Sequence, residues 1–210
     1  MINMNLLCTS DPHGVVPVQM SNIIKEREID AIICAGDFTP HGWHGEGGSM
    51  KDVINFLLSL NKPIFFVHGN IDPSPDYFSS LEANYKNLNY IHLKRAKIGD
   101  YYLVGIGDFH FMPNVVMDKL EELVKRDPKK TIIVSHYPPK GLVDFTSDGE
   151  HAGIERFREI IEKYQPLLFI CGHIHEAAGV TKLGKTTIVN ASMKNILAEI
   201  NDGEVNISLV

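Results

Sequence analysis

Five short apolar runs rich in β-branched residues constrain the fold of this chain more than any other feature of its sequence. They lie at Met4–Thr9, Asp30–Ala35, Pro63–Val67, Thr131–Ser135 and Leu167–Cys171. Short continuous runs of this kind are typical of strands buried on both faces. Helical spacing between the first three runs predicts a β-α-β-α-β opening, and therefore a parallel sheet with right-handed crossovers.

Helices are predicted wherever apolar residues recur at helical spacing, at Val16–Glu28, Ser49–Leu60, Asp76–Lys86, Asn114–Lys125 and Gly153–Tyr164. Further short strands are expected at Tyr90–Leu93, Ala96–Ile98, Tyr101–Gly105, Ala177–Lys182, Thr186–Asn190, Ile196–Ile200 and Val205–Val210. We expect the four tail strands to be antiparallel and to extend a second sheet. The pattern favours a single α/β domain over residues 1–210, an α+β arrangement of four layers in which two mixed sheets form a sandwich flanked by helices.

Composition excludes several classes of protein. No apolar run approaches the ~20 residues that a membrane span needs, and Met1–Thr9 lacks the features of a secretory signal. Cys8, Cys34 and Cys171 are odd in number and set in apolar runs, so we expect buried thiols and a reducing, cytoplasmic location. The net charge of −6 argues against an extended nucleic-acid surface but not against a small anionic substrate. No motif specifies an oligomeric state.

Each of the five apolar runs is followed by a side chain of a type that binds metals. In chain order these residues are Asp11, His13, Asp37, Asn70, His136, His173 and His175. The carboxyl ends of strands in open α/β sheets form the ligand crevice, so we expect these side chains to converge. A set of nitrogen and oxygen donors without thiolate suits Mn²⁺, Fe, Zn²⁺ or Ni²⁺ more than Ca²⁺ or an iron–sulfur cluster. Seven ligands exceed one tetrahedral ion but fit two ions that share a carboxylate, which is an arrangement that catalyses displacement at phosphorus.

The ordered motifs D-x-H, G-D, G-N-x-D, H and G-H-x-H span residues 11–175. In this order they resemble the calcineurin-like metallophosphoesterase superfamily, and the surrounding residues are similar to its small prokaryotic Icc-related members. The resemblance implies that Asp11, His13 and His175 hold one ion, that Asn70, His136 and His173 hold the other, and that Asp37 bridges them. It further implies two divalent ions, with Mn²⁺ preferred, and a metal-bridging hydroxide that attacks a small phosphate ester beside Asp37, Asn70 and His136.

Ile71 departs from the family pattern, which commonly has a histidine at this position that assists the leaving group. Isoleucine cannot transfer a proton, a contribution typically worth about 10²–10⁴-fold, so substrates with acidic leaving groups are expected. His41 or His44 could replace the missing acid from the glycine-rich loop at residues 40–48, whereas His110 and His151 are candidates for substrate contact. The polar segment Lys140–Glu150 is either a lid or a mobile loop.

The leading hypothesis is a metal-dependent phosphodiesterase. A monoester dianion would benefit more from additional cationic groups, and no arginine accompanies the motifs. Two alternatives stay open: a phosphomonoesterase, including a protein phosphatase, and a non-catalytic protein-binding scaffold on the same fold.

Overall fold

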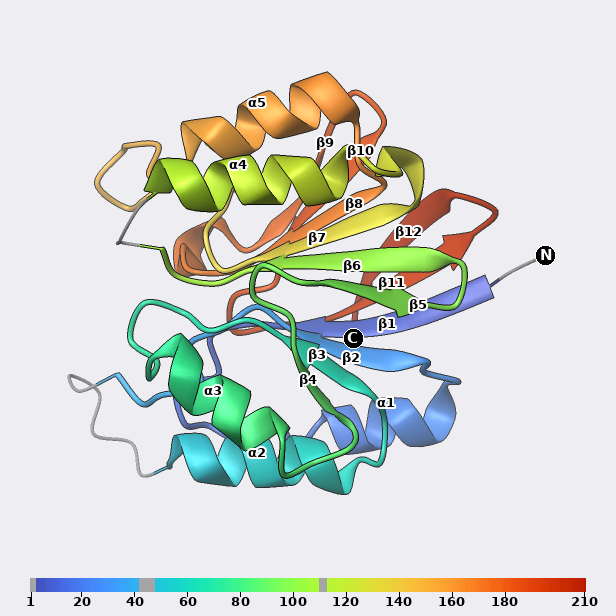
Figure 1. Ribbon diagram of the computed structural model, residues 1–210. Helices are drawn as coiled ribbons and strands as arrows, with labels where there is room; N and C mark the ends of the chain where they lie inside the picture. The colour runs from blue at the N-terminus through green and yellow to red at the C-terminus, as the bar shows by residue number, and fades with distance from the viewer. Residues whose placement is uncertain (1–2, 42–47, 110–112) are drawn as a thin grey trace.

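Two six-stranded sheets pack face to face, with helices on both outer faces (Figure 1). The computed structural model describes residues 3–41, 48–109 and 113–210. The first sheet has the order β12 (Glu204–Leu209), β11 (Asn195–Asn201), β1 (Asn3–Thr9), β2 (Ala31–Cys34), β3 (Ile64–Phe66) and β4 (Leu88–Tyr90). The second has the order β5 (Arg95–Ile98), β6 (Tyr101–Ile106), β7 (Thr131–Ser135), β8 (Leu168–Cys171), β10 (Thr186–Asn190) and β9 (Gly179–Leu183).

Both sheets are mixed. In the first, β1 is parallel to β2 and antiparallel to β11; in the second, β10 is parallel to β8 and antiparallel to β9. The α-helices are α1 (Met20–Glu26), α2 (Met50–Ser59), α3 (Pro75–Glu82), α4 (Pro113–Val124) and α5 (Glu155–Tyr164), and short 3₁₀ turns cover Pro128–Lys130 and His175–Ala177. The predicted sandwich of two mixed sheets flanked by helices is therefore confirmed.

The central strands are apolar at nearly every position because each sheet is covered on both faces. In β1, the side chains of Leu6 and Cys8 enter the core between the sheets, whereas Leu7 packs on the other face, where α1, α2 and α3 lie. In β7, Val134 faces the same central core, and Ile133 packs beneath α4 and α5. Because successive side chains along a strand point to opposite faces, the strands contribute to three apolar layers, one between the sheets and one under the helices on each outer face.

Two predictions about the elements were wrong. The first helix begins at Met20 and not at Val16. Pro17 disfavours helical backbone at the residue before it, so the preceding segment runs as turns across the surface. The tail does not extend one sheet: β9 and β10 join the second sheet, whereas β11 and β12 return to the first.

The three cysteines are buried and free, as predicted. Among the helices in the described parts of the chain, we find none with the length and apolar character that a membrane span requires.

Candidate metal centre

Six of the seven predicted ligands form two groups at the carboxyl edge of the strands. The first triad is Asp11, His13 and His175, and the second triad is Asp37, His136 and His173; within each, the candidate donor atoms lie within 4.8 Å of one another. The seventh residue, Asn70, places Oδ1 2.8 Å from His136 Nε2 and so adjoins the second triad. The structure thus brings together all seven residues that the sequence singles out.

Hydrogen bonds between loops hold the two sheets in this register. Within the first sheet, the backbone N–H of Asp11 donates to the carbonyl of Gly36, and between the sheets the imidazole of His136 meets the carbonyl of Ala35. The backbone N–H of His173 donates to both carboxylate oxygens of Asp11, at 3.2 and 3.0 Å. The strand ends of both sheets therefore share one polar edge.

Left-handed backbone occurs at four of the seven residues. The φ angles are 56° at Asp11, 44° at His13, 55° at Asp37 and 73° at His173. Such conformations are uncommon outside glycine and gather at functional sites, where surrounding contacts enforce them. The segment from His173 to His175 is therefore turned and not extended. Its turn sends the two imidazoles to different triads.

Glycines make room for the carboxylates. A Cβ on Gly172 would lie 2.2 Å from Asp11 Oδ2, and one on Gly69 would lie 2.0 Å from Asp37 Oδ1. Among the motif glycines Gly36, Gly69 and Gly172, only Gly36 has a positive φ, of 103°. At Gly69 and Gly172 the requirement is space.

The histidine tautomers fit a cation in each triad. If His136 donates from Nδ1 to the carbonyl of Ala35 (2.9 Å), its Nε2 lone pair faces Asn70 Oδ1. If His13 donates from Nδ1 to the carbonyl of Thr39 (3.2 Å), its Nε2 lies 3.1 Å from Nε2 of His175. A proton or a cation between these two nitrogens would keep their lone pairs from facing each other. Anchoring the other ring nitrogen on a backbone carbonyl is what metal-ligating histidines commonly do.

The two buried aspartates differ in how the protein compensates their charge. Burial opposes ionisation of Asp11, but hydrogen bonds, chiefly from His175, lower its pKa to about 2. Burial raises the pKa of Asp37 to about 6, and the charges of Asp11 and Asp72 act in the same direction against the attraction of His136. Of the two, Asp37 is the carboxylate that protein groups compensate less, which suits a position between two cations.

Burial lowers the pKa of His173 to about 4, and the neighbouring His136 adds to this effect. A neutral imidazole is the form that binds a metal ion. His173 is therefore held in the protonation state that a metal ligand requires.

Two residues outside the ligand set support the triads, and one of them, Ser192, carried no signal in the sequence. Ser192, in the tail, donates its hydroxyl to Asp11 Oδ2 at 3.0 Å. Asp72, the last residue of the G-N-x-D motif, accepts hydrogen bonds from the backbone and hydroxyl of Thr39 and from the backbone N–H of Gly69. These contacts fix both strand-end loops beside the ligands.

The remaining candidate histidines have distinct surroundings. His41 makes an edge-on ring contact with His13, with centroids 5.6 Å apart, whereas His44 and His110 lie outside the described residues. His151 points Nδ1 at Asp144, 2.7 Å away.

Buried Asp144 also accepts the backbone N–H groups of Gly141 and Gly153. The N–H of Gly153 is thus used inside this loop. The segment Lys140–Glu150 is therefore organised around one buried carboxylate.

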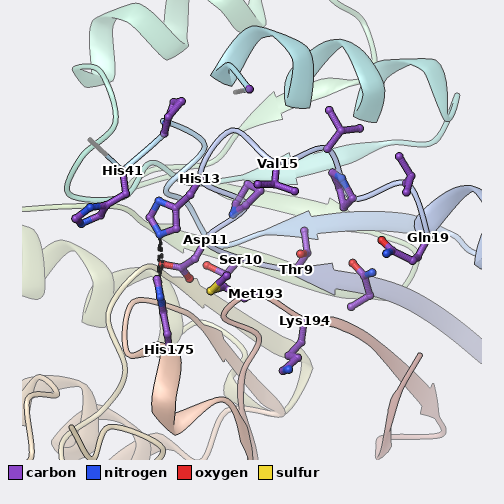
Figure 2. Close-up of a pocket in the computed structure, with 17 residues that line it drawn as sticks. Thr9, Ser10, Asp11, His13, Val15, Gln19, His41, His175, Met193 and Lys194 are labelled. Carbon is purple, nitrogen blue, oxygen red and sulfur yellow. Dashed lines mark hydrogen bonds and ion pairs between the residues drawn. The ribbon is translucent and has the colours of Figure 1, made fainter. Parts of the chain in front are cut away.

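A groove of about 1010 Å³ begins at the first triad. Figure 2 shows the His13–His175 pair at its left end and Gln19 at its right end, with Val15 above and Met193 below. A smaller hollow of about 310 Å³ adjoins the second triad; its walls include His173, Phe109 and Tyr137.

Comparisons with known proteins show what this chain is similar to. The family model described as calcineurin-like phosphoesterase matches residues 4–177. An uncharacterised protein of Methanocaldococcus jannaschii is 30% identical over 211 residues, covering 91% of this chain and 89% of that one.

Two solved structures share the fold at low identity. TT1561 of Thermus thermophilus has a TM-score of 0.69 at 16% identity, with 99% of both chains covered. An archaeal phosphodiesterase has a TM-score of 0.58 at 14% identity, covering 99% of this chain and 100% of that one. The family match over residues 4–177 confirms the resemblance noted in the sequence, and the two structures show the shared fold.

Proposed function

The chain belongs to the calcineurin-like phosphoesterase family, whose members are metal-dependent, and we propose that it is a phosphoesterase with two metal ions that prefers phosphodiesters. The observation that carries the proposal is the pair of triads. Each combines a buried carboxylate with two imidazoles, and at each a pair of donor atoms faces across about 3 Å.

We assign the first ion to Asp11, His13 and His175, and the second to Asn70, His136 and His173, with Asp37 between them. When bound, the ions would supply an acidified water as nucleophile and positive charge for the phosphate oxygens. Manganese is our preferred metal, since the donors are nitrogen and oxygen only; Fe, Zn²⁺ and Ni²⁺ are alternatives.

The residues of the chain would orient and compensate these ions. Ser192 holds Asp11 in place, and the backbone N–H of Ile71 donates to Asp37 Oδ1 at 3.2 Å. In the second triad, His136 is fully buried, so its ring is locked between Ala35 and Asn70. A locked ligand set needs little reorganisation during the reaction.

Sparse positive charge around the site favours diesters. Among the described residues that line the groove, Lys194 is the one lysine or arginine. A monoester dianion gains more than a diester monoanion from such groups. The archaeal phosphodiesterase with the same fold is compatible with this preference.

The side chain of Ile71 has no proton to transfer, so we propose that His41 assists the leaving group. Its ring contacts His13 edge-on and lines the groove beside the first triad. If this is correct, His41→Ala slows esters of poor leaving groups about 10²-fold and esters of good ones much less. Equal slowing of both ester classes would contradict the assignment.

The decisive assay compares bis-p-nitrophenyl phosphate with p-nitrophenyl phosphate at saturating Mn²⁺, for the wild type, Asp37→Ala and His136→Ala. We expect faster diester turnover and its loss in both variants, with circular dichroism confirming that they fold. Equal turnover by all three proteins would leave the protein-binding scaffold as the better interpretation. Faster monoester turnover would overturn the diester preference.

A further inference from the structure

The groove beside the first triad has exposed aliphatic side chains in its walls. Val15, Val18 and Met193 line it and are 56%, 58% and 62% exposed, respectively. Large aliphatic side chains this exposed are ordinary when they occur singly, but three in one concave surface mark a binding site for apolar material. Pro17 and Val16 also line the groove.

The backbone holds these side chains in position. The segment before α1 is tied by hydrogen bonds from the N–H of Val18 to the carbonyl of Val16 and from the N–H of Met20 to the carbonyl of Pro17. The opposite wall is fixed because the N–H of Met193 donates to the carbonyl of Ser10 at 2.9 Å. The groove is therefore built into the fold.

The groove is continuous with the proposed reaction centre. Asp11, His13 and His175 line it as well as forming the first triad. A ligand that places a phosphate at the triad would extend its organic substituent between Val15 and Met193, as the view in Figure 2 indicates. At about 1010 Å³ the groove reaches the upper end of the usual size of small-molecule sites.

The lining also discriminates between substituents. No phenylalanine, tyrosine or tryptophan occurs among the described lining residues, so a nucleobase would find no aromatic side chain of these types on which to stack. In the same described part of the lining, only Lys194 contributes a permanent positive charge, which does not suit a polyphosphate or an oligonucleotide.

We propose that this groove binds an aliphatic chain esterified to the phosphate, so that the substrate is an amphiphilic alkyl phosphodiester and not a nucleotide. The inference rests on the proposed function for its phosphate position. Burial of each methylene group then contributes about fourfold to binding.

The test uses p-nitrophenyl phosphodiesters whose second ester is methyl, butyl, octyl or 5′-thymidyl. Because the leaving group is constant, kcat/KM should rise by up to about fourfold per methylene until the chain fills the groove. The octyl ester should exceed the thymidyl ester. Val18→Asp should remove most of the octyl-to-methyl ratio, and Val115→Asp, at an exposed valine on α4, should leave that ratio intact.

A binding measurement separates this inference from the proposed function. Calorimetric titration of the Mn²⁺-loaded protein with methylphosphonate and octylphosphonate requires no turnover. Tighter binding of octylphosphonate, weakened by Val18→Asp, supports the groove even if no ester is hydrolysed. Turnover without dependence on chain length, or a preference for the thymidyl ester, would overturn the inference and leave the phosphoesterase proposal standing.

Discussion

The two triads are built from the same residue types but differ in what surrounds them. In the first triad, the side chain of His175 is 38% exposed and the donors open onto the aliphatic groove. In the second, His136 is fully buried, and Tyr137 packs its ring against both histidines of the triad. The contrast suggests a division in which the open triad meets the substrate and the enclosed triad fixes the geometry.

Each triad takes its residues from both sheets. The first combines Asp11 and His13, which follow β1, with His175, which follows β8. The second combines Asp37, which follows β2, with His136 and His173 from the second sheet. Metal bound at either triad would connect the two sheets, so ligand binding and folding should be coupled.

The largest expected effect is the loss of activity when one histidine ligand is removed from either triad. His136→Ala should lower kcat/KM by about 10³-fold or more, because an ion contributes several kcal/mol to transition-state stabilisation. His175→Ala should cause a loss of similar size at limiting metal, but excess Mn²⁺ should restore much of it, since this position is open to solvent. Kinetics across a range of Mn²⁺ concentrations measures both. Equal rescue of the two variants would contradict the proposed difference.

Removing the two metal ions with a chelator should lower the stability of the protein in two steps, because the triads differ in their exposure to solvent. Each ion held at about 100 times its dissociation constant adds about 2.7 kcal/mol to the free energy of unfolding. Removing both should therefore lower Tm by roughly 10–20 °C for a chain of this size. Calorimetry at increasing chelator concentration, with metal content measured in parallel, should show the more exposed first-triad ion leaving first. Simultaneous loss of both ions would show that the sites are coupled.

A histidine outside both triads tests whether burial alone produces an acid-sensitive group. Nδ1 of His92 accepts the backbone N–H of Gly107 at 2.9 Å, which requires the unprotonated nitrogen. Burial lowers the pKa of His92 from 6.5 to about 4. Because the folded-state pKa lies below the unfolded value, the stabilisation is complete above pH 6.5 and is lost as the pH falls to about 4.

Denaturant unfolding of the wild type and His92→Asn checks this expectation. Asparagine keeps an acceptor for Gly107 and does not titrate. The wild type should lose up to about 3 kcal/mol more than the variant between about pH 6.5 and pH 4. Parallel curves over this interval would show that His92 does not change its protonation there.

The smallest expected effect concerns the support of the first triad. Ser192→Ala removes the hydroxyl that donates to Asp11 and should weaken metal binding at that triad about tenfold or somewhat more. Competition with a fluorescent chelator measures it, and Ser147→Ala, on the exposed loop, serves as the control. If Ser192→Ala weakened metal binding at the second triad instead, the assignment of Ser192 to the first triad would be contradicted.

Particular residues show how far the sequence could go. The seven ligands were predicted because each follows an apolar run, and parallel strands deliver such positions to one edge. The contribution of Ser192 could not be predicted, because a serine in a tail of short strands has no pattern that ties it to Asp11, 181 residues away. The wall of the groove was not predicted, because the apolar spacing of Val16–Glu28 was interpreted as a helix. Apolar spacing alone does not reveal a segment that runs as turns beside a site.

By itself the sequence determined the fold class, the order of the strands along the chain and the identity of the polar residues at their ends. These are local properties: periodicity, β-branching and the residue that follows a strand. Only the tertiary structure decided that the tail would divide between the two sheets, that His173 and His175 would serve different triads, and that an aliphatic groove would open beside the first triad. These outcomes depend on contacts between segments far apart in the chain, where packing and hydrogen bonding select among arrangements that local pattern leaves equivalent.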